Sequence, residues 1–311
     1  MRYQLLLLSS LFVFSLAAQE PETPTEEPKP EPYQPKPQDI VIGEQFEQLL
    51  PAAQLKWVGD NDARFLVRSK TDETGQALGT IVIVPGPGKT IDNAGYVRRA
   101  LEYFPTVSWH VMVIPSGDLD FTGPDVKMPE TSSTADSNTG ANAEENTADS
   151  AESASGDTSK PEPMIMPADQ WYSDQQKNNL EMLTARVNLA LSNLPEPQKG
   201  YVLVTASGSA GVLVSAVAAG QLTPNAVVLV DVEHPVIAKR DQMNQDIVNL
   251  TMPVLDLYQP LERKQAELRA PNSRKPTYKQ TMIPAVNSDY VGVEDLLLRT
   301  VRGWLRKQMK Q

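Results

Sequence analysis

Small residues follow a buried apolar segment at residues 202–211, with the sequence VLVTASGSAG. This pattern predicts a strand that ends in a tight turn and leads into an apolar helix. A serine on such a turn, in the pattern G-x-S-x-G, has its hydroxyl exposed above the strand. The N–H groups at the start of the helix can then stabilise an oxyanion. The run therefore indicates a site for nucleophilic serine chemistry.

Two serines of this turn are candidate nucleophiles. Ser207 directly follows the strand, but neither glycine of the pattern flanks it at the required spacing. Ser209 retains the second glycine, Gly211, but lies two residues later. We favour Ser207 because the strand is expected to end at Thr205. The alternative is that either hydroxyl caps the following helix, whose first N–H groups need acceptors.

A serine nucleophile needs a general base, and the chain has only two histidines. His110 lies inside a predicted strand, which favours a packed position in the core. His234 follows a predicted strand and is the candidate base. Asp256 is the candidate acid that would orient the base, although it falls within a predicted strand. Glu233 and Glu262 are further candidate acids.

A loop with two glycines follows another apolar strand, at residues 84–90 (VPGPGKT). The Gly-Lys-Thr sequence resembles a phosphate-binding loop, but that motif needs a glycine where Ile83 stands. Two prolines also remove backbone N–H donors from the loop. We interpret it as the oxyanion side of the serine site, where Gly86 and Gly88 would allow close backbone approach to a ligand. The sequence predicts no cofactor and no metal ion.

The segments around these residues alternate between strand-like and helical patterns. Runs rich in Val, Ile and Leu predict strands at 63–69, 79–85, 109–115, 201–205, 226–231, 252–258 and 278–283. Helical patterns fall at 93–103, 170–194, 210–219, 236–249 and 292–310. The alternation predicts an α/β fold with a doubly wound, mostly parallel sheet and helices on both faces. Ligands bind such sheets beyond the carboxyl ends of the strands.

Three segments are expected to lie outside the folded domain. Residues 1–18 have the pattern of a signal peptide, with Arg2 before an apolar run and small residues at its end. Residues 19–38 form a proline-rich acidic tether, and residues 129–162 form an acidic insert that is expected to be disordered. The remainder of residues 39–311 is predicted to be a single domain.

Composition limits the functions that the protein could have. The net charge is −11, and most of it falls in the tether and the insert, which gives no support for nucleic-acid binding. The chain has no cysteine, so it cannot use disulfides in an oxidising compartment. The signal peptide predicts a periplasmic or secreted protein. Its apolar run is shorter than the about 20 residues of a membrane span, so no span is expected after cleavage.

Several segments together resemble an uncharacterised family of exported α/β-hydrolase-like proteins of proteobacteria, a domain of unknown function. They are residues 81–88, the serine turn, and residues 253–258 (PVLDLY), 283–290 (IPAVNSDY) and 301–305 (VRGWL). The resemblance implies an α/β-hydrolase fold over about residues 46–307. It also implies that relatives have a histidine where this chain has Ser288. A serine cannot act as a base near neutral pH, so the resemblance implies an eroded catalytic triad.

We therefore predict an exported α/β-hydrolase-fold protein that acts as a non-catalytic binding or scaffolding module of the bacterial envelope. Its expected partner is a small acyl or peptide ligand or an envelope protein, and not a nucleic acid. The alternative hypothesis is a serine hydrolase that acts on an ester or amide. It would use Ser207 or Ser209 as nucleophile and His234 as an atypical base.

Overall fold

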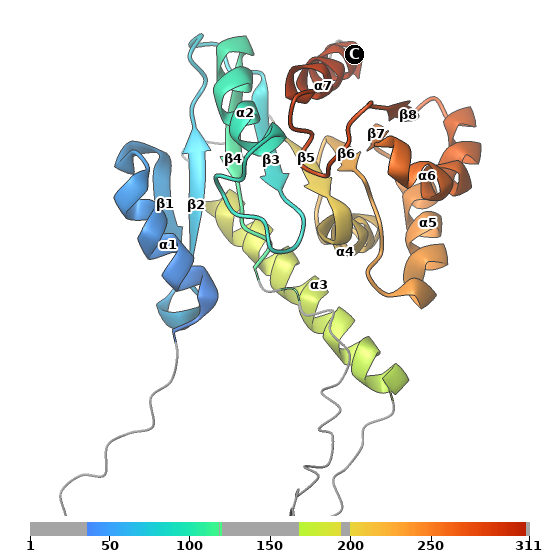
Figure 1. The fold of residues 1–311 in the computed structure, drawn as a ribbon, viewed down its shortest axis with the longest axis horizontal. Coiled ribbons are helices and arrows are strands. Elements are labelled where there is room, and N and C mark those ends of the chain that lie inside the picture. The colour runs from blue at the N-terminus through green and yellow to red at the C-terminus, as the bar shows by residue number, and fades with distance from the viewer. Residues whose placement is uncertain (1–35, 118, 120–167, 194–199, 309–311) are drawn as a thin grey trace, which may run out of the picture. The chain divides into compact units, whose positions relative to one another are not determined.

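A single β-sheet forms the centre of the computed structural model, which describes residues 36–117, 119, 168–193 and 200–308. Its strands are β1 (Leu55–Val58), β2 (Phe65–Lys70), β3 (Gly79–Val84), β4 (Trp109–Val113), β5 (Tyr201–Ala206), β6 (Ala226–Val230), β7 (Val254–Tyr258) and β8 (Tyr278–Met282). The order across the sheet is β1-β2-β4-β3-β5-β6-β7-β8. Strand β2 is antiparallel to β1 and β4, and all other neighbouring pairs are parallel (Figure 1).

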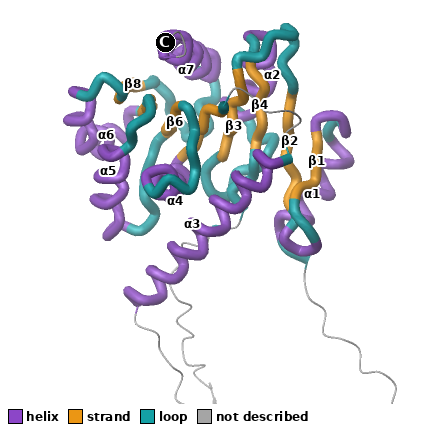
Figure 2. The backbone as a smooth tube through the Cα atoms, turned by 180° about the vertical axis from the view of Figure 1, so that it is seen from behind, coloured by secondary structure: helices purple, strands orange, loops and turns teal. Residues whose placement is uncertain are grey.

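Helices cover both faces of this sheet. They are α1 (Gln38–Leu49), α2 (Tyr96–Tyr103), α3 (Ala168–Ser192), α4 (Ser207–Ala218), α5 (Arg240–Asn249), α6 (Arg263–Arg269) and α7 (Glu294–Gln308). Helices α2 and α7 lie on one face, and α3, α4 and α5 lie on the other (Figures 1 and 2). Alternate residues of β3 point into the two layers: Ile81 and Ile83 join the core under α2 and α7, whereas Val82 and Val84 join the core under α3 and α4. A strand covered on both faces must be apolar at every position, which explains its continuous apolar sequence.

The structure confirms the predicted fold class, and each predicted strand and helix is present with its ends shifted by a few residues. Three elements were missed. Strand β1 has only four residues, one of them a lysine, and α6 has seven residues of which four are charged. Helix α1 begins at the end of the predicted tether and contains Gly43. The signal peptide, residues 19–35 of the tether and the insert at 129–162 lie outside the described residues.

The carboxyl ends of the parallel strands meet at one edge of the sheet. The segments that follow β3, β4, β5, β6, β7 and β8 all leave from this edge, and they carry most of the residues considered below. None of the described helices combines the length and the apolar character that crossing a bilayer requires.

Candidate functional site

The turn after β5 has the strained geometry of a nucleophile elbow. Strand β5 ends at Ala206, and α4 begins at Ser207, whose φ is +48°. A positive φ is uncommon for a residue with a side chain, and such strain concentrates at functional sites. Ala206 occupies the N-cap position and has no hydroxyl, so neither serine of the turn caps α4, and that alternative is wrong.

The two candidate serines differ in their surroundings. Ser207 lines a small recess at the edge where the parallel strands end. Ser209 is fully buried in the first turn of α4, and its Oγ has no hydrogen-bond partner among the described residues. Only Ser207 is therefore placed where a ligand could reach it.

The loop after β3 forms the opposite wall of this recess. A Cβ added to Gly86 would lie 3.2 Å from the Cβ of Ser207 and 3.3 Å from its Oγ, so a side chain here would crowd the hydroxyl. Gly86 thus lies where the oxyanion-side interpretation placed it. Gly88 does not line the recess; it lines a neighbouring, larger pocket.

The loop after β8 completes the recess with Ser288 and Asp289. This loop is held against the start of α2, because the N–H of Tyr96 donates to the carbonyl of Asp289 at 3.0 Å. A Cβ at Gly95 would lie 2.0 Å from the same carbonyl oxygen, so only glycine permits this approach. Ser288, the position where the resemblance implies a histidine, therefore shares the recess with Ser207.

Asp289, the residue after Ser288, is paired with two side chains of the loop after β3 and the segment that follows it. Lys89 lines the recess, and its Nζ lies 3.0 Å from Oδ2 of Asp289. The side-chain amide of Asn93 donates to Oδ1 of Asp289 at 2.7 Å. Lys89 therefore acts in this arrangement as a hydrogen-bond donor to Asp289.

Both histidines lie outside the recess. His234 is buried, and its Nδ1 lies 3.1 Å from the N–H of Val236. Loss of hydration lowers the pKa of His234. His110 lies at the start of β4, at the opposite edge of the sheet, where its Nδ1 accepts the N–H of Asp72 at 3.0 Å. It is half-buried there, and not packed in the core as predicted.

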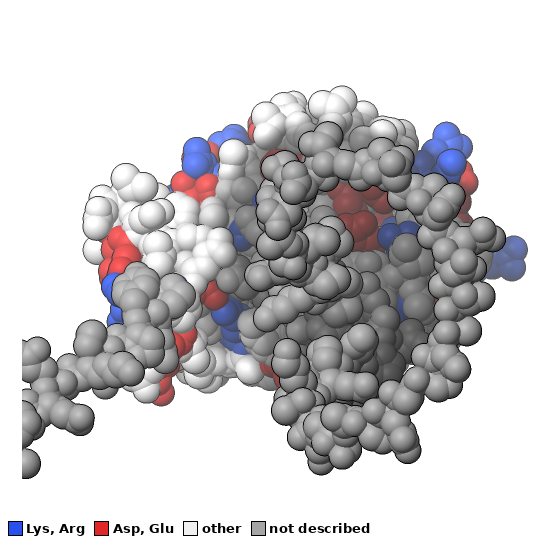
Figure 3. Space-filling view, turned by 60° about the horizontal axis from the view of Figure 1, so that its bottom comes forward, with Lys and Arg blue, Asp and Glu red and all other residues white. Residues whose placement is uncertain are grey.

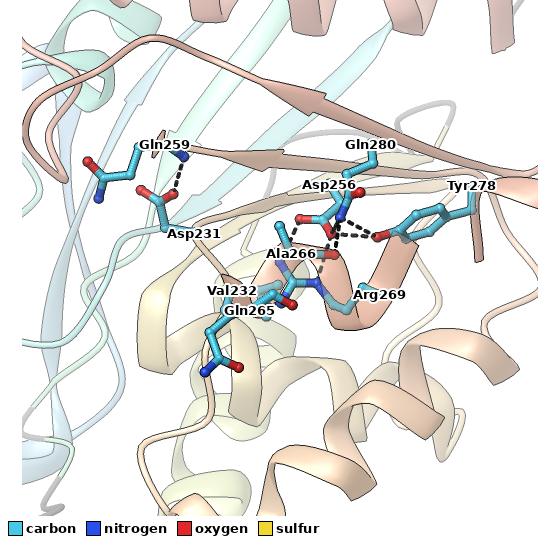
Figure 4. Close-up of polar contacts among 9 residues, drawn as sticks. All are labelled: Asp231, Val232, Asp256, Gln259, Gln265, Ala266, Arg269, Tyr278 and Gln280. Atoms are coloured by element: carbon cyan, nitrogen blue, oxygen red, sulfur yellow. Dashed lines mark hydrogen bonds and ion pairs between the residues drawn. The ribbon is translucent and has the colours of Figure 1, made fainter. Parts of the chain in front are cut away.

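Asp256 lies in the middle of β7 and is fully buried (Figure 4). Arg269 of α6 donates to both of its carboxylate oxygens, from Nε at 2.8 Å and from the terminal nitrogen at 3.2 Å. The Tyr278 hydroxyl and the Gln280 amide also donate to it. The carboxylate is therefore committed to a structural cluster, and the structure does not bring it to His234 or to Ser207.

Asp231 is a residue at this edge that the sequence analysis did not select. It directly follows β6, has a φ of +49° and is buried. Its Oδ1 accepts the N–H of Gln259 at 2.8 Å (Figure 4), whereas its Oδ2 has no hydrogen-bond partner among the described residues. Burial raises the pKa of Asp231 to about 6. An aspartate that directly follows an apolar strand at the ligand-binding edge is the signal that could have identified it.

Two tyrosines connect Asp231 to the recess. The hydroxyl of Tyr290 lies beside the Asp231 carboxylate, where it favours the ionised form of the acid. The Tyr290 ring packs edge-on against Tyr96, with 6.1 Å between the ring centroids, and Tyr96 lines the recess. Ser207, Ser288 and Asp231 thus occupy one connected region, while Asp256 belongs to another.

The described residues offer no group of three or more His, Asp or Glu side chains that could hold a metal ion. On the face shown in Figure 3, the visible Lys and Arg side chains are scattered and do not join into one continuous basic patch.

The strand order, the antiparallel β2 and the serine elbow define the α/β-hydrolase fold. Within that class, the chain belongs to the family described as "Protein of unknown function (DUF3530)", whose model matches residues 3–307. No curated protein matches the sequence.

Solved structures that are similar include enzymes. Est1E from Butyrivibrio proteoclasticus has 9% sequence identity and a TM-score of 0.55, over 83% of this chain and 100% of that chain. Est1E with ferulic acid bound gives 8% identity and a TM-score of 0.54, over 82% and 100% of the two chains. A dienelactone hydrolase from Anabaena variabilis has 12% identity and a TM-score of 0.50, over 82% and 99%. At these identities the similarity shows the fold alone.

Proposed function

We propose that this protein is a non-catalytic member of the α/β-hydrolase fold that binds a small acyl or peptide ligand in a proteobacterial envelope. One observation carries the proposal: the recess that contains Ser207 contains Ser288 and a Lys89–Asp289 ion pair, and no histidine. Both histidines of the chain lie outside the recess, and the Nδ1 of each accepts a backbone N–H, from Asp72 at His110 and from Val236 at His234.

The missing base matters because the members of a triad act as a unit. Without a base, a serine hydroxyl is a weak nucleophile near neutral pH, and removing the histidine of a triad costs about as much activity as removing all three members. The recess still offers a hydroxyl from Ser207 and an ammonium from Lys89. These donors suit the non-covalent binding of a carboxyl or carbonyl group.

Export is part of the proposal and rests on the signal-peptide pattern of residues 1–18. Sequencing the N-terminus of the protein recovered from a periplasmic fraction would test it. Recovery of an uncleaved chain from the cytoplasm would contradict it. Deleting residues 19–38 would abolish envelope association if the tether mediates it.

A serine hydrolase is the second candidate function, and the geometry of Ser207 favours it. Its positive φ and the close approach of Gly86 are what an active elbow would need. In this candidate His234 would have to act as the base, although it does not line the recess.

Labelling of the mature protein with a fluorophosphonate probe separates the two functions. We expect no labelling of the unmodified protein. Ser288→His introduces the missing imidazole, and labelling gained in this variant but lost again on adding Ser207→Ala would indicate that the elbow is otherwise intact. The proposal fails if the unmodified protein is labelled and the signal disappears in Ser207→Ala and in His234→Ala. Ser209→Ala serves as the matched control, because Ser209 is buried.

A further inference from the structure

A separate groove lies at the edge of the sheet opposite to the Ser207 recess. Two segments line it: residues 217–225, where α4 ends and leads into β6, and residues 249–252, where α5 ends and leads toward β7. Both segments precede the amino ends of parallel strands, whereas the recess lies at the carboxyl ends. The groove has a volume of about 470 Å³, within the range of about 300–1,000 Å³ that is usual for small-molecule sites.

The segment between α4 and β6 is fixed at both of its ends. Gly220, whose φ is +72°, ends the helix, and the N–H of Gln221 donates to the carbonyl of Ala216 at 2.9 Å. This is the glycine-dependent arrangement that satisfies the last carbonyls of a helix. Just before β6, the N–H of Asn225 donates to the carbonyl of Tyr201 at 2.8 Å.

The segment between α5 and β7 is fixed as well. The ammonium of Lys275 donates to the carbonyl of Val248 in the last turn of α5. The N–H of Val227 in β6 donates to the carbonyl of Pro253 at 2.9 Å, which ties this segment to the neighbouring strand. Because the backbone of both segments is held by the fold, the groove is a built feature of the protein.

The walls of the groove combine buried apolar side chains with exposed polar ones. The buried apolar residues are Val217, Leu222, Pro224 and Leu250. Each segment also contributes one exposed threonine and one exposed asparagine: Thr223 with Asn225, and Thr251 with Asn249. None of the described residues that line the groove is charged.

This composition limits the chemical class of a ligand. A charged ligand is disfavoured, because a charge taken out of water without a partner loses its hydration. A hydrocarbon is disfavoured too, because it would displace water from amide and hydroxyl groups without replacing the hydrogen bonds. Asparagine and threonine side chains both donate and accept hydrogen bonds, as the hydroxyl groups of a ligand do. The Oδ1 of Asn249 accepts the Gln245 amide at 3.3 Å, which leaves the N–H groups of Asn249 to donate.

We propose that this groove binds a neutral saccharide of about two sugar rings. The C–H faces of the rings lie on the buried apolar residues, and the ring hydroxyls bond to the threonine and asparagine side chains. The inference goes beyond the proposed function and does not depend on it, because the groove and the Ser207 recess lie at opposite edges of the sheet.

An NMR titration of the isotope-labelled mature protein with cellobiose tests the proposal. We expect saturable shifts at residues 217–225 and 249–252, with a dissociation constant in the millimolar range. Cellobionate, which has nearly the same size but carries a carboxylate, should bind at least tenfold more weakly, since the groove offers no cation. The neutral peptide acetyl-trialanine amide should also bind more weakly than cellobiose.

Two adjacent alanines provide a matched pair of variants. Ala218 and Ala219 are both exposed at the end of α4, but only Ala218 lines the groove. Ala218→Trp should fill the groove and weaken cellobiose binding at least tenfold, whereas Ala219→Trp should leave it within about twofold. Thr251→Val removes one hydroxyl and should weaken binding about two- to tenfold. Thr277→Val, at a residue that does not line the groove, is its control.

The proposal is overturned if the folded protein shows no saturation below about 100 mM cellobiose, or if Ala218→Trp binds as tightly as Ala219→Trp. Equal binding of cellobionate overturns the assignment to a neutral ligand. Tighter binding of acetyl-trialanine amide than of cellobiose overturns the assignment to a saccharide. Fluorophosphonate labelling decides the proposed function separately, and neither of its outcomes changes these expectations.

Discussion

Two buried aspartates on neighbouring strands of this sheet have opposite surroundings. Asp256 lies within β7 and receives hydrogen bonds from Arg269, Tyr278 and Gln280. Asp231 lies at the end of β6, receives one backbone hydrogen bond, and has one oxygen without a partner among the described residues. Figure 4 shows both residues with their partners.

The difference between them follows from where each lies along its strand. A carboxylate inside the sheet cannot reach water, so it is stable only when the protein supplies a full set of donors. A carboxylate at the strand end lies in the region where ligands and catalytic partners gather. Asp231 therefore keeps one oxygen without a hydrogen-bond partner among the described residues, whereas both oxygens of Asp256 accept hydrogen bonds.

The largest expected effect comes from removing Arg269 from the hydrogen-bonded cluster around Asp256. Arg269→Met leaves the Asp256 carboxylate buried without its cation, and we expect a loss of about 3–5 kcal/mol in the free energy of unfolding. Urea denaturation would measure it. The double variant Asp256→Leu/Arg269→Met should recover most of the loss, since it removes both charges. A loss below about 1 kcal/mol for Arg269→Met would show that the ion pair does not stabilise the fold.

The second prediction concerns the pH dependence that Asp231 introduces. Its pKa is raised from 3.8 to about 6 in the folded protein, so the folded state holds more protons than the unfolded state between these values. Its contribution to stability is therefore present below pH 4 and is lost as the pH rises through 6. Asp231→Asn keeps the acceptor for Gln259 and removes the titration.

We expect Asp231→Asn to match the unmodified protein at pH 4 and to be more stable by about 2–3 kcal/mol at pH 7. Urea denaturation across this pH range measures the difference. A difference that does not change with pH would contradict the assignment of a raised pKa to Asp231.

A smaller effect is expected from Tyr290→Phe. The Tyr290 hydroxyl favours the ionised form of Asp231, so its removal should raise the Asp231 pKa above 6. The pH at which stability is lost should then move upward, while stability at pH 4 changes by less than about 1 kcal/mol. A carboxyl-carbon NMR titration would measure the Asp231 pKa. A lower Asp231 pKa in Tyr290→Phe than in the unmodified protein would contradict the prediction.

The smallest effect is expected at an exposed ion pair in the same helix as Arg269. Arg263 and Glu267 are 2.9 Å apart, and both side chains are more than 60% exposed. Arg263→Ala should change the free energy of unfolding by less than about 0.5 kcal/mol, because solvent screens the pair. A loss as large as that of Arg269→Met would remove the contrast between buried and exposed pairs.

Much of the fold was predictable from sequence because it depends on local composition. The continuous apolar runs of β3, β5 and β6 are required by burial on both faces, and they identified the parallel strands directly. Strand β1 was missed because it has four residues and lies at the edge of the sheet, where little burial constrains its sequence. Helix α6 was missed because it is short and largely charged.

The site was predictable only in part. Ser207 and Gly86, both selected from the sequence, line the same recess, because each lies within two residues of the end of an apolar strand at the ligand-binding edge. Asp256 was selected from its place in the chain order of a triad. Nothing near it in the sequence indicates that Arg269, 13 residues later, would enclose it.

The sequence by itself determined the α/β fold, the position of the serine turn and the scarcity of histidine, since these follow from apolar periodicity and composition. Only the tertiary structure decided which polar groups meet. It brings Ser288 into the same recess as Ser207 and pairs Asp256, but not Asp231, with an arginine. It also forms an apolar pocket between α1 and a loop about 45 residues away in the chain. The physical reason is that contacts between distant segments depend on sheet order and on packing, which no local pattern of residues records.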